Sequence, residues 1–231
     1  MNERENILGR IREALRHPAP MPGTHDAPAG MPHSPTEPPG AQARDWLPAV
    51  GSSEAEQFEL FAKHCADLKA DFRRLARLEE LPAALAKIRD EENWQRIASH
   101  EGELCRSACQ TLGLPVLLTD KGYEAQALEQ CDVGITECDA LIAQTGGVAV
   151  SSRSAGGRAL SVLPPHHIVI ARGEQLVPDL PAAFALLQQK YSPQFPSMIS
   201  IITGPSRTGD IERILVLGAH GPKKLTIFCI A

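Results

Sequence analysis

Two spacings of apolar residues alternate along the first half of the compact region. Stretches with apolar residues three or four positions apart are typical of helices with one buried face, and short apolar runs between them are typical of strands. Helices are predicted from Ser52, over 79–91 and over Glu101–Leu112, and strands over Phe72–Leu75, Trp94–Ala98 and Val116–Leu118. This alternation predicts an α/β fold, an open sheet with flanking helices.

From Val133 onward the pattern favours strands. Val133–Ser152 contains strand-like runs around a tight Thr-Gly-Gly turn, and Leu160–Ala171 ends in a β-branched run typical of a buried strand. A helix is predicted over 177–191. The apolar runs Met198–Ile202 and Leu225–Ile230 enclose a segment that we expect to form a strand, loop, short helix, loop and strand.

The N-terminal region differs from this compact part. Residues 1–16 predict a short amphipathic helix with Ile7, Leu8 and Ile11 on one face. Residues 17–50 hold nine of the nineteen prolines and few large apolar residues, so we expect a disordered linker. The predicted organisation is therefore a helix over 1–16, a linker over 17–50 and an α/β domain over 51–231.

Composition narrows the classes of function. The net charge of -5 argues against nucleic acid as a partner, because phosphate contacts need a basic surface. No apolar run approaches the roughly 20 residues that a membrane span needs, and the first residues lack the apolar core of a secretory signal. The protein is thus expected in the cytoplasm. Its six cysteines have neither iron–sulfur nor zinc spacing, so no metal and no cluster are expected in this chain.

A first candidate for chemistry is the segment SSRSAGGRALS, residues 151–161, which combines hydroxyls, two arginines and a glycine pair. Backbone amides of a glycine-rich turn can surround an anion, and an arginine adds a bidentate donor. Gly156, Gly157 and Arg158 are therefore candidate ligand-binding residues. The alternative is a solvated turn whose arginines pair with nearby carboxylates.

The second candidate is TGPSRTGDIE, residues 203–212. Gly204 and Pro205 end a strand, which would place Ser206, Arg207 and Thr208 at the mouth of a short helix, where free amides favour an anion. Asp210 would stabilise the start of that helix. Helix capping alone is the competing interpretation, although it leaves the arginine unexplained.

Two histidines and one further turn complete the candidate set. His220 lies in a glycine-rich turn, where it could serve as an acid or a base. His167 begins an apolar strand, so it is either a ligand or a core histidine. Thr145 and Gly146 belong to the AQTGG turn.

All these segments follow or precede strands, and ligands of open α/β sheets bind at the carboxyl ends of strands. We therefore expect Ser206–Thr208 and Arg153–Arg158 to converge on one anion site, with His220 facing it. The sequence contains no nucleophile elbow, phosphate-binding P-loop, zinc-protease motif or dinucleotide fingerprint that would define a reaction.

Five segments in this order resemble the LUD-domain family, in its lactate-utilisation branch: RENILGRIREAL, LSVLPPHHIVIA, VPDL, TGPSRTGDIE and LGAHGPKKL. The resemblance implies a NagB/RpiA/CoA-transferase-like fold and a role in oxidising L-lactate to pyruvate beside iron–sulfur partner subunits. Any cluster would then lie in those partners. Relatives often carry an acidic residue where this chain has Gln144, and glutamine cannot act as a carboxylate base or nucleophile.

Three functions remain open at this point. The chain could be the non-cluster subunit of a lactate-oxidising system, with a pocket for an anionic small molecule. It could be an assembly or regulatory protein that holds partners through its N-terminal helix and has a vestigial pocket. The fold implied by the resemblance also admits a stand-alone isomerase or CoA-transferase-like enzyme.

Overall fold

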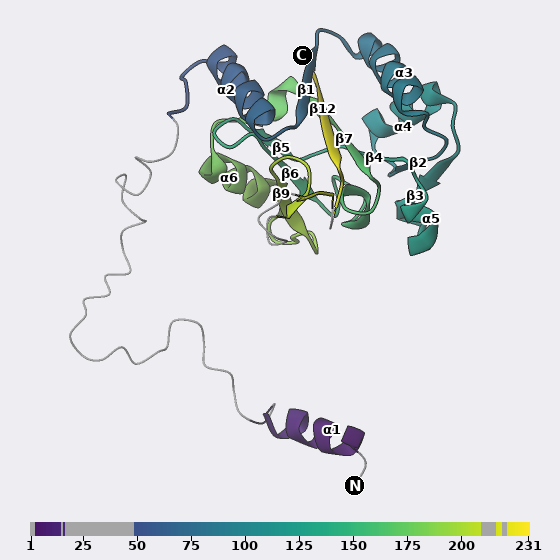
Figure 1. Ribbon diagram of the computed structural model, residues 1–231. Coiled ribbons are helices and arrows are strands. Elements are labelled where there is room, and N and C mark those ends of the chain that lie inside the picture. The colour runs from purple at the N-terminus through teal and green to yellow at the C-terminus, as the bar shows by residue number, and fades with distance from the viewer. Residues whose placement is uncertain (1–2, 15, 17–48, 209–215, 219–220) are drawn as a thin grey trace, which may run out of the picture. The chain divides into compact units, whose positions relative to one another are not determined.

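The computed structural model describes residues 3–14, 16, 49–208, 216–218 and 221–231 (Figure 1). The chain divides into two units, Met1–Trp46 and Leu47–Ala231. The first unit contains helix α1 (Glu3–Ala14). The predicted linker lies almost entirely outside the described residues, and so do Asp210 and His220, so the roles expected for them stay predictions.

A six-stranded parallel sheet is the centre of the second unit, with strand order β1-β12-β7-β4-β2-β3. Its strands are β1 (Asp71–Leu75), β2 (Ile97–Ser99), β3 (Val116–Leu118), β4 (Val133–Thr136), β7 (His166–Arg172) and β12 (Lys224–Ile230). Because every pair is parallel, all carboxyl ends lie along one edge of this sheet and all amino ends along the opposite edge. We call these the carboxyl edge and the amino edge.

Helices α3 (Leu81–Glu92) and α4 (Glu103–Leu112) cover one face of the sheet (Figure 1). Leu85 and Ile88 of α3 and Leu104 of α4 pack with Ile168 and other buried aliphatic residues of the strands. A smaller cluster, which includes Ala98 and Leu128, lies beside the short helix α5 (Ala125–Glu129).

A second, four-stranded sheet and helix α2 (Glu54–Asp67) pack on the other face. The strand order of this sheet is β8-β5-β6-β9, built from β5 (Ala140–Ile142), β6 (Gly147–Ser151), β8 (Leu176–Val177) and β9 (Ile199–Ile202). Helix α6 (Leu180–Tyr191) packs on this sheet through Ala183. The remaining elements are the short helices η2 (Leu78–Glu80), η3 (Thr119–Lys121), η4 (Ala159–Ser161) and η5 (Gly173–Gln175).

The predicted α/β class, an open sheet with flanking helices, is confirmed, and local chemistry explains most element ends. Ser53 and Glu56 form a capping box at the start of α2. Pro82 lies in the first turn of α3, where its missing N–H costs no hydrogen bond. Asp179 accepts the backbone N–H of Ala182 and begins α6.

Arg207–Thr208 form strand β10, which pairs antiparallel with β11 (Val216–Leu217) in a short two-stranded ribbon. The short helix that was predicted to follow these residues lies outside the described part of the chain, so it stays a prediction. The carbonyl of Ser206 accepts the N–H of Gly218, which joins the two arms of this ribbon just before β10.

Candidate functional site

Two of the predicted glycine turns lie side by side. Strands β6 and β9 are antiparallel, with Val148 paired to Ile202, and this register places the turn at Thr145–Gly147 next to Gly204. Gly146 and Gly204 both have positive φ, +64° and +92°. The structure therefore brings together two segments that are far apart in the sequence.

Both turns also press against the end of α2. A Cβ atom on Gly146 would lie 2.7 Å from Cβ of His64, and one on Gly204 would lie 2.7 Å from the carbonyl oxygen of Leu68. The backbone conformation and the close approach each require glycine at these positions. The two turns consequently form a narrow surface fixed by α2.

Ser206 and Arg207 extend this surface. The N–H of Ser206 donates to the carbonyl of Pro222 at 2.9 Å, just before the amino end of β12. Arg207 is exposed, and a Cβ on Gly204 would lie 3.3 Å from Arg207 Nη2, so the guanidinium lies over that turn. We call Thr145, Gly146, Gly204, Ser206 and Arg207 the glycine-turn surface.

The other predicted turn lies at the opposite edge of the sheet. Thr119 Oγ1 donates to the carbonyl of Gly156 at 2.8 Å, and a Cβ on Gly156 would overlap Cβ of His100. Thr119 and His100 directly follow β3 and β2 at the carboxyl edge. Ser206, in contrast, bonds to Pro222 near the amino edge. The expected convergence of Ser206–Thr208 with Arg153–Arg158 is therefore wrong.

The path of the chain explains this separation. After β6 it passes the carboxyl edge at Gly156, and Leu160 then packs against Ala98 on the face of the sheet. The chain finally enters β7 from the amino edge at His166. Gly157 and Arg158 belong to this crossing segment, and ligand binding by them stays a prediction.

His167 is a core histidine. It is the second residue of β7 and is 1% exposed, and its Nε2 lies 2.9 Å from Thr136 Oγ1. Nδ1 has no hydrogen-bond partner among the described residues. Burial lowers the pKa of His167 to about 3, because the interior disfavours the charged imidazolium. The competing sequence interpretation, a strand histidine in the core, is the one that the structure shows.

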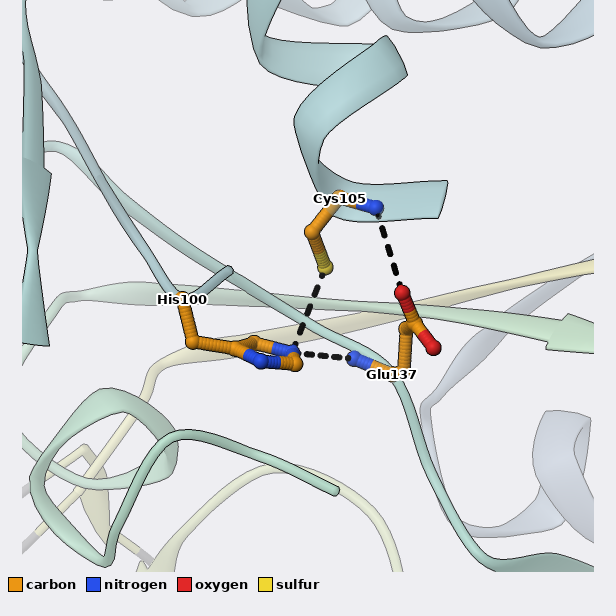
Figure 2. Close-up of side chains that lie close together, drawn as sticks. All are labelled: His100, Cys105 and Glu137. Atoms are coloured by element: carbon orange, nitrogen blue, oxygen red, sulfur yellow. Dashed lines mark hydrogen bonds between the residues drawn. The ribbon is translucent and has the colours of Figure 1, made fainter. Parts of the chain in front are cut away.

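The structure also assembles a cluster that the sequence analysis missed (Figure 2). His100 follows β2, Glu137 follows β4, and Cys105 lies in the first turn of α4. One ligating atom from each lies within 4.8 Å of the other two. Figure 2 shows the three side chains directed toward one another, and we call them the carboxyl-edge cluster.

Backbone amides orient this cluster. The N–H of Glu137 donates to His100 Nε2 at 3.2 Å, so that nitrogen carries the lone pair and the ring proton of neutral His100 lies on Nδ1. Glu137 Oε1 accepts the N–H of Leu104 at 2.8 Å and that of Cys105 at 3.4 Å. Glu137 thus caps α4 from a neighbouring strand.

Sγ of Cys105 lies 3.5 Å from His100 Nε2 and 3.6 Å from the carbonyl oxygen of Ile135, and a thiol is a weak hydrogen-bond donor and acceptor. Burial raises the pKa of the Cys105 thiol well above its usual value, and the charge of Glu137 adds to this. Burial lowers the pKa of His100. The pair is therefore a neutral thiol beside a neutral imidazole, which does not favour a thiolate nucleophile.

No sequence motif contains these three residues. His100 and Cys105 are five positions apart, and Glu137 comes much later in the chain, directly after β4. One sequence signal could have found them. His100 and Glu137 both come directly after strands of the parallel sheet, where side chains from separate strands meet.

The LUD domain is recognised over residues 58–230, which include both the glycine-turn surface and the carboxyl-edge cluster. The chain belongs to the LUD-domain family. Lactate utilization protein C of Oceanobacillus iheyensis is 30% identical over 192 residues, which cover 78% of this chain and 82% of that protein. Lactate utilization protein C of Bacillus subtilis is 37% identical over 115 residues, 48% of each chain.

A solved structure supports the same assignment. The crystal structure of a DUF162 family protein from Deinococcus radiodurans matches this LUD-domain protein with a TM-score of 0.61 and 25% identity, over 78% of this chain and all of the other. Within the described part of the chain, no helix is both long and apolar enough to cross a membrane.

Proposed function

We propose that this LUD-domain protein is the subunit of a cytoplasmic L-lactate utilisation system that carries no iron–sulfur cluster and binds an anionic small molecule. The observation that carries the proposal is the match to lactate utilization protein C of Oceanobacillus iheyensis over most of both chains. Oxidation of lactate to pyruvate releases two electrons, which iron–sulfur partner subunits would accept, and two protons, which would pass to solvent. The cysteine spacing of this chain supports placing the clusters in those partners.

The glycine-turn surface is the proposed anion site. Lactate and pyruvate are carboxylates, and a guanidinium binds a carboxylate through two parallel hydrogen bonds. Arg207 is exposed and lies over Gly204, which has no side chain to block the approach of a ligand. The hydroxyl of Ser206 adds a neighbouring donor.

Calorimetric titration of the full chain with L-lactate and with pyruvate tests this site. Arg207→Ala should weaken binding about ten- to a hundredfold, because a hydrogen bond to a charged group contributes roughly 1.5–3 kcal/mol. Arg158→Ala is the matched control and should leave the affinity unchanged, since Arg158 belongs to the segment that crosses the sheet and not to the glycine-turn surface. Absence of binding to the wild type, or an equal loss in both variants, would refute the proposed site.

The division of labour has its own test. The isolated chain should not oxidise lactate, whereas a mixture with the iron–sulfur partners should reduce an electron acceptor when lactate is added. Omission of this chain from the mixture should abolish the reaction. Lactate turnover by the isolated chain would instead support a stand-alone enzyme.

A second candidate function, assembly of partner subunits, is favoured by the surface of α1. Ile7 and Leu8 are 55% and 37% exposed there, and an apolar helix face usually needs a partner. Ile7→Asp should then reduce co-purification of the partners and leave ligand binding unchanged. Equal partner recovery with wild type and variant would remove this candidate.

A further inference from the structure

The carboxyl-edge cluster combines a nitrogen, a sulfur and an oxygen donor from three separate elements. His100 and Cys105 are 5% and 0% exposed, and Glu137 is partly buried. Imidazole, thiolate and carboxylate together are a donor set that suits zinc and related divalent transition metals. Helix capping explains the orientation of Glu137, and the thiol of Cys105 makes weak hydrogen bonds with His100 Nε2 and the carbonyl oxygen of Ile135.

The spacing of these donors fits metal coordination. In a tetrahedral zinc site, Zn–N bonds of about 2.0–2.1 Å and Zn–S bonds of about 2.3 Å place nitrogen and sulfur about 3.6 Å apart. Cys105 Sγ and His100 Nε2 are 3.5 Å apart. All three ligating atoms lie within 4.8 Å of one another, so they must draw closer to bind one ion, and His100 Nε2 must exchange the N–H of Glu137 for the metal.

Two glycines pack closely against the carboxyl-edge cluster. A Cβ on Gly102 would overlap Oε1 of Glu137 and would lie 2.7 Å from Cε1 of His100. Gly156 packs against the base of the same side chain, where a Cβ would overlap Cβ of His100. The backbone therefore encloses His100 from two sides and limits its ring to positions near Cys105 and Glu137.

We propose that His100 Nε2, Cys105 Sγ and the Glu137 carboxylate bind one divalent transition metal ion, zinc foremost. This site is distinct from the glycine-turn surface and does not depend on the function proposed for it. Binding requires the thiol of Cys105 to release its proton to solvent as the sulfur–metal bond forms, and no electron is transferred. The thiolate and the carboxylate then balance the charge of the ion.

Three protein ligands leave one tetrahedral position for water or another small ligand. A cavity of about 380 Å³ adjoins the cluster and is lined by His100 together with Arg106, Cys109, Leu114 and Leu118. Because His100 belongs to both, a molecule in this cavity would lie beside a metal ligand. The site is consequently proposed as a metal centre with an open position.

Titration of metal-free, full-length protein with Zn²⁺ and with Co²⁺ tests the proposal. We expect one ion per chain, and with Co²⁺ the near-ultraviolet absorption that arises from a cobalt–thiolate bond. Cys105→Ser should abolish this absorption and weaken binding about a hundredfold or more, since even indirect partners of a metal change affinity ten- to a hundredfold. His100→Gln should weaken binding similarly.

Cys109→Ser is the matched control, because Cys109 lies one turn further along α4 and is also buried. This variant should keep both the stoichiometry and the absorption. Absence of stoichiometric binding by the wild type, unchanged binding by Cys105→Ser, or an equal loss in Cys109→Ser would overturn the proposal.

X-ray absorption of the zinc-loaded wild type gives a readout that does not depend on any variant folding. We expect a coordination shell with one sulfur and the remaining ligands nitrogen or oxygen. A shell without sulfur, or with two sulfurs, would overturn the assignment of these three ligands.

Discussion

Two buried histidines, each beside a glutamate, lie at opposite edges of the parallel sheet. They differ in how completely the polar atoms around them form close hydrogen bonds. At the amino edge, His166 Nδ1 lies 2.9 Å from Glu92 Oε2, and His166 Nε2 lies 2.9 Å from Thr226 Oγ1. Glu92 also accepts hydrogen bonds from Trp94 Nε1 at 3.0 Å and Lys224 Nζ at 2.8 Å. Every ring nitrogen and carboxylate oxygen of this group therefore has a close partner.

At the carboxyl edge, His100 and Glu137 form the corresponding pair, but the hydrogen bond to the His100 ring is longer. His100 Nε2 accepts one backbone N–H at 3.2 Å, and the thiol of Cys105, a weak hydrogen-bonding group, lies 3.5 Å from that nitrogen and 3.6 Å from the carbonyl oxygen of Ile135. A fully bonded polar group stabilises the fold, whereas a cluster with weaker hydrogen bonds can exchange them for a ligand. The comparison supports a structural role for the His166–Glu92 group and the metal binding proposed for the carboxyl-edge cluster.

The electrostatics agree with this contrast. Burial raises the pKa of the Glu92 carboxyl, but hydrogen bonds from Lys224 and His166 outweigh it and the net pKa is lowered. Burial lowers the pKa of His166, and Glu92 opposes that shift. Glu92 and His166 thus each shift the pKa of the other in the direction opposite to the effect of burial, so the pair needs no further ion.

The largest expected effect is the removal of the central acceptor at the amino edge. Glu92→Ala should lower the free energy of unfolding by about 2–4 kcal/mol, because it leaves the buried donors of His166 and Trp94 without partners, each worth roughly 1–3 kcal/mol. Urea unfolding measures the change. Glu91→Ala is the control: Glu91 makes only a long, exposed contact to Lys87, so its loss should cost less than about 0.5 kcal/mol.

Metal affinity should be unchanged in Glu92→Ala if the two edges have separate roles. A variant that unfolds like the wild type, or one that loses zinc binding while folded, would contradict the division between them.

The next effect concerns pH. His167, with a pKa of about 3 in the folded chain, titrates near 6.5 when unfolded, so below pH 6.5 the unfolded state binds a proton that the folded state does not. Stability should therefore fall as the pH drops below 6.5, by about 1.4 kcal/mol per pH unit, or about 2 kcal/mol at pH 5. The lowered pKa values of His100 and His166 act in the same direction.

Urea unfolding at pH 7.5, 6.5 and 5 measures this slope. His167→Gln removes one titrating group and should make the slope shallower, since the unfolded variant gains one proton fewer. An unchanged slope in the variant, or a wild type whose stability is constant down to pH 5, would contradict this account of His167.

Much of the fold was predictable because its signals are local. The capping residues Ser53 and Asp179 and the proline in α3 begin helices through contacts within a few positions. The β-branched run of β7 indicates a buried parallel strand from its composition alone. Each of these features depends on residues that are neighbours in the sequence, so it can be recognised without knowing where distant segments lie.

The candidate sites were only partly predictable because they depend on register and chain path. The glycines of Thr145–Gly147 and of Gly204 were recognisable as turns, but only the pairing of β6 with β9 brings them together. Nothing local indicates that the segment through Arg158 returns across the sheet. The carboxyl-edge cluster joins two strand ends and a helix start, and no spacing rule connects His100 to Glu137.

The smallest expected effect is that of removing one negative charge, that of Glu137, at the carboxyl edge. Glu137→Gln keeps an oxygen that can accept the N–H groups of Leu104 and Cys105, so it removes little more than the favourable interaction of a carboxylate with the start of α4. An exposed or partly buried charge at a helix end contributes about 0.3–1 kcal/mol, and the metal-free variant should lose that much in urea unfolding.

With zinc present the difference from wild type should grow, because a neutral amide is a poorer ligand for the ion than a carboxylate. Glu92→Gln provides the comparison, since its loss should be the same with and without zinc. If Glu137→Gln instead costs several kcal/mol in the metal-free protein and zinc adds nothing, the carboxyl edge is held together by its own hydrogen bonds, as the amino edge is, and the contrast between the two histidines disappears.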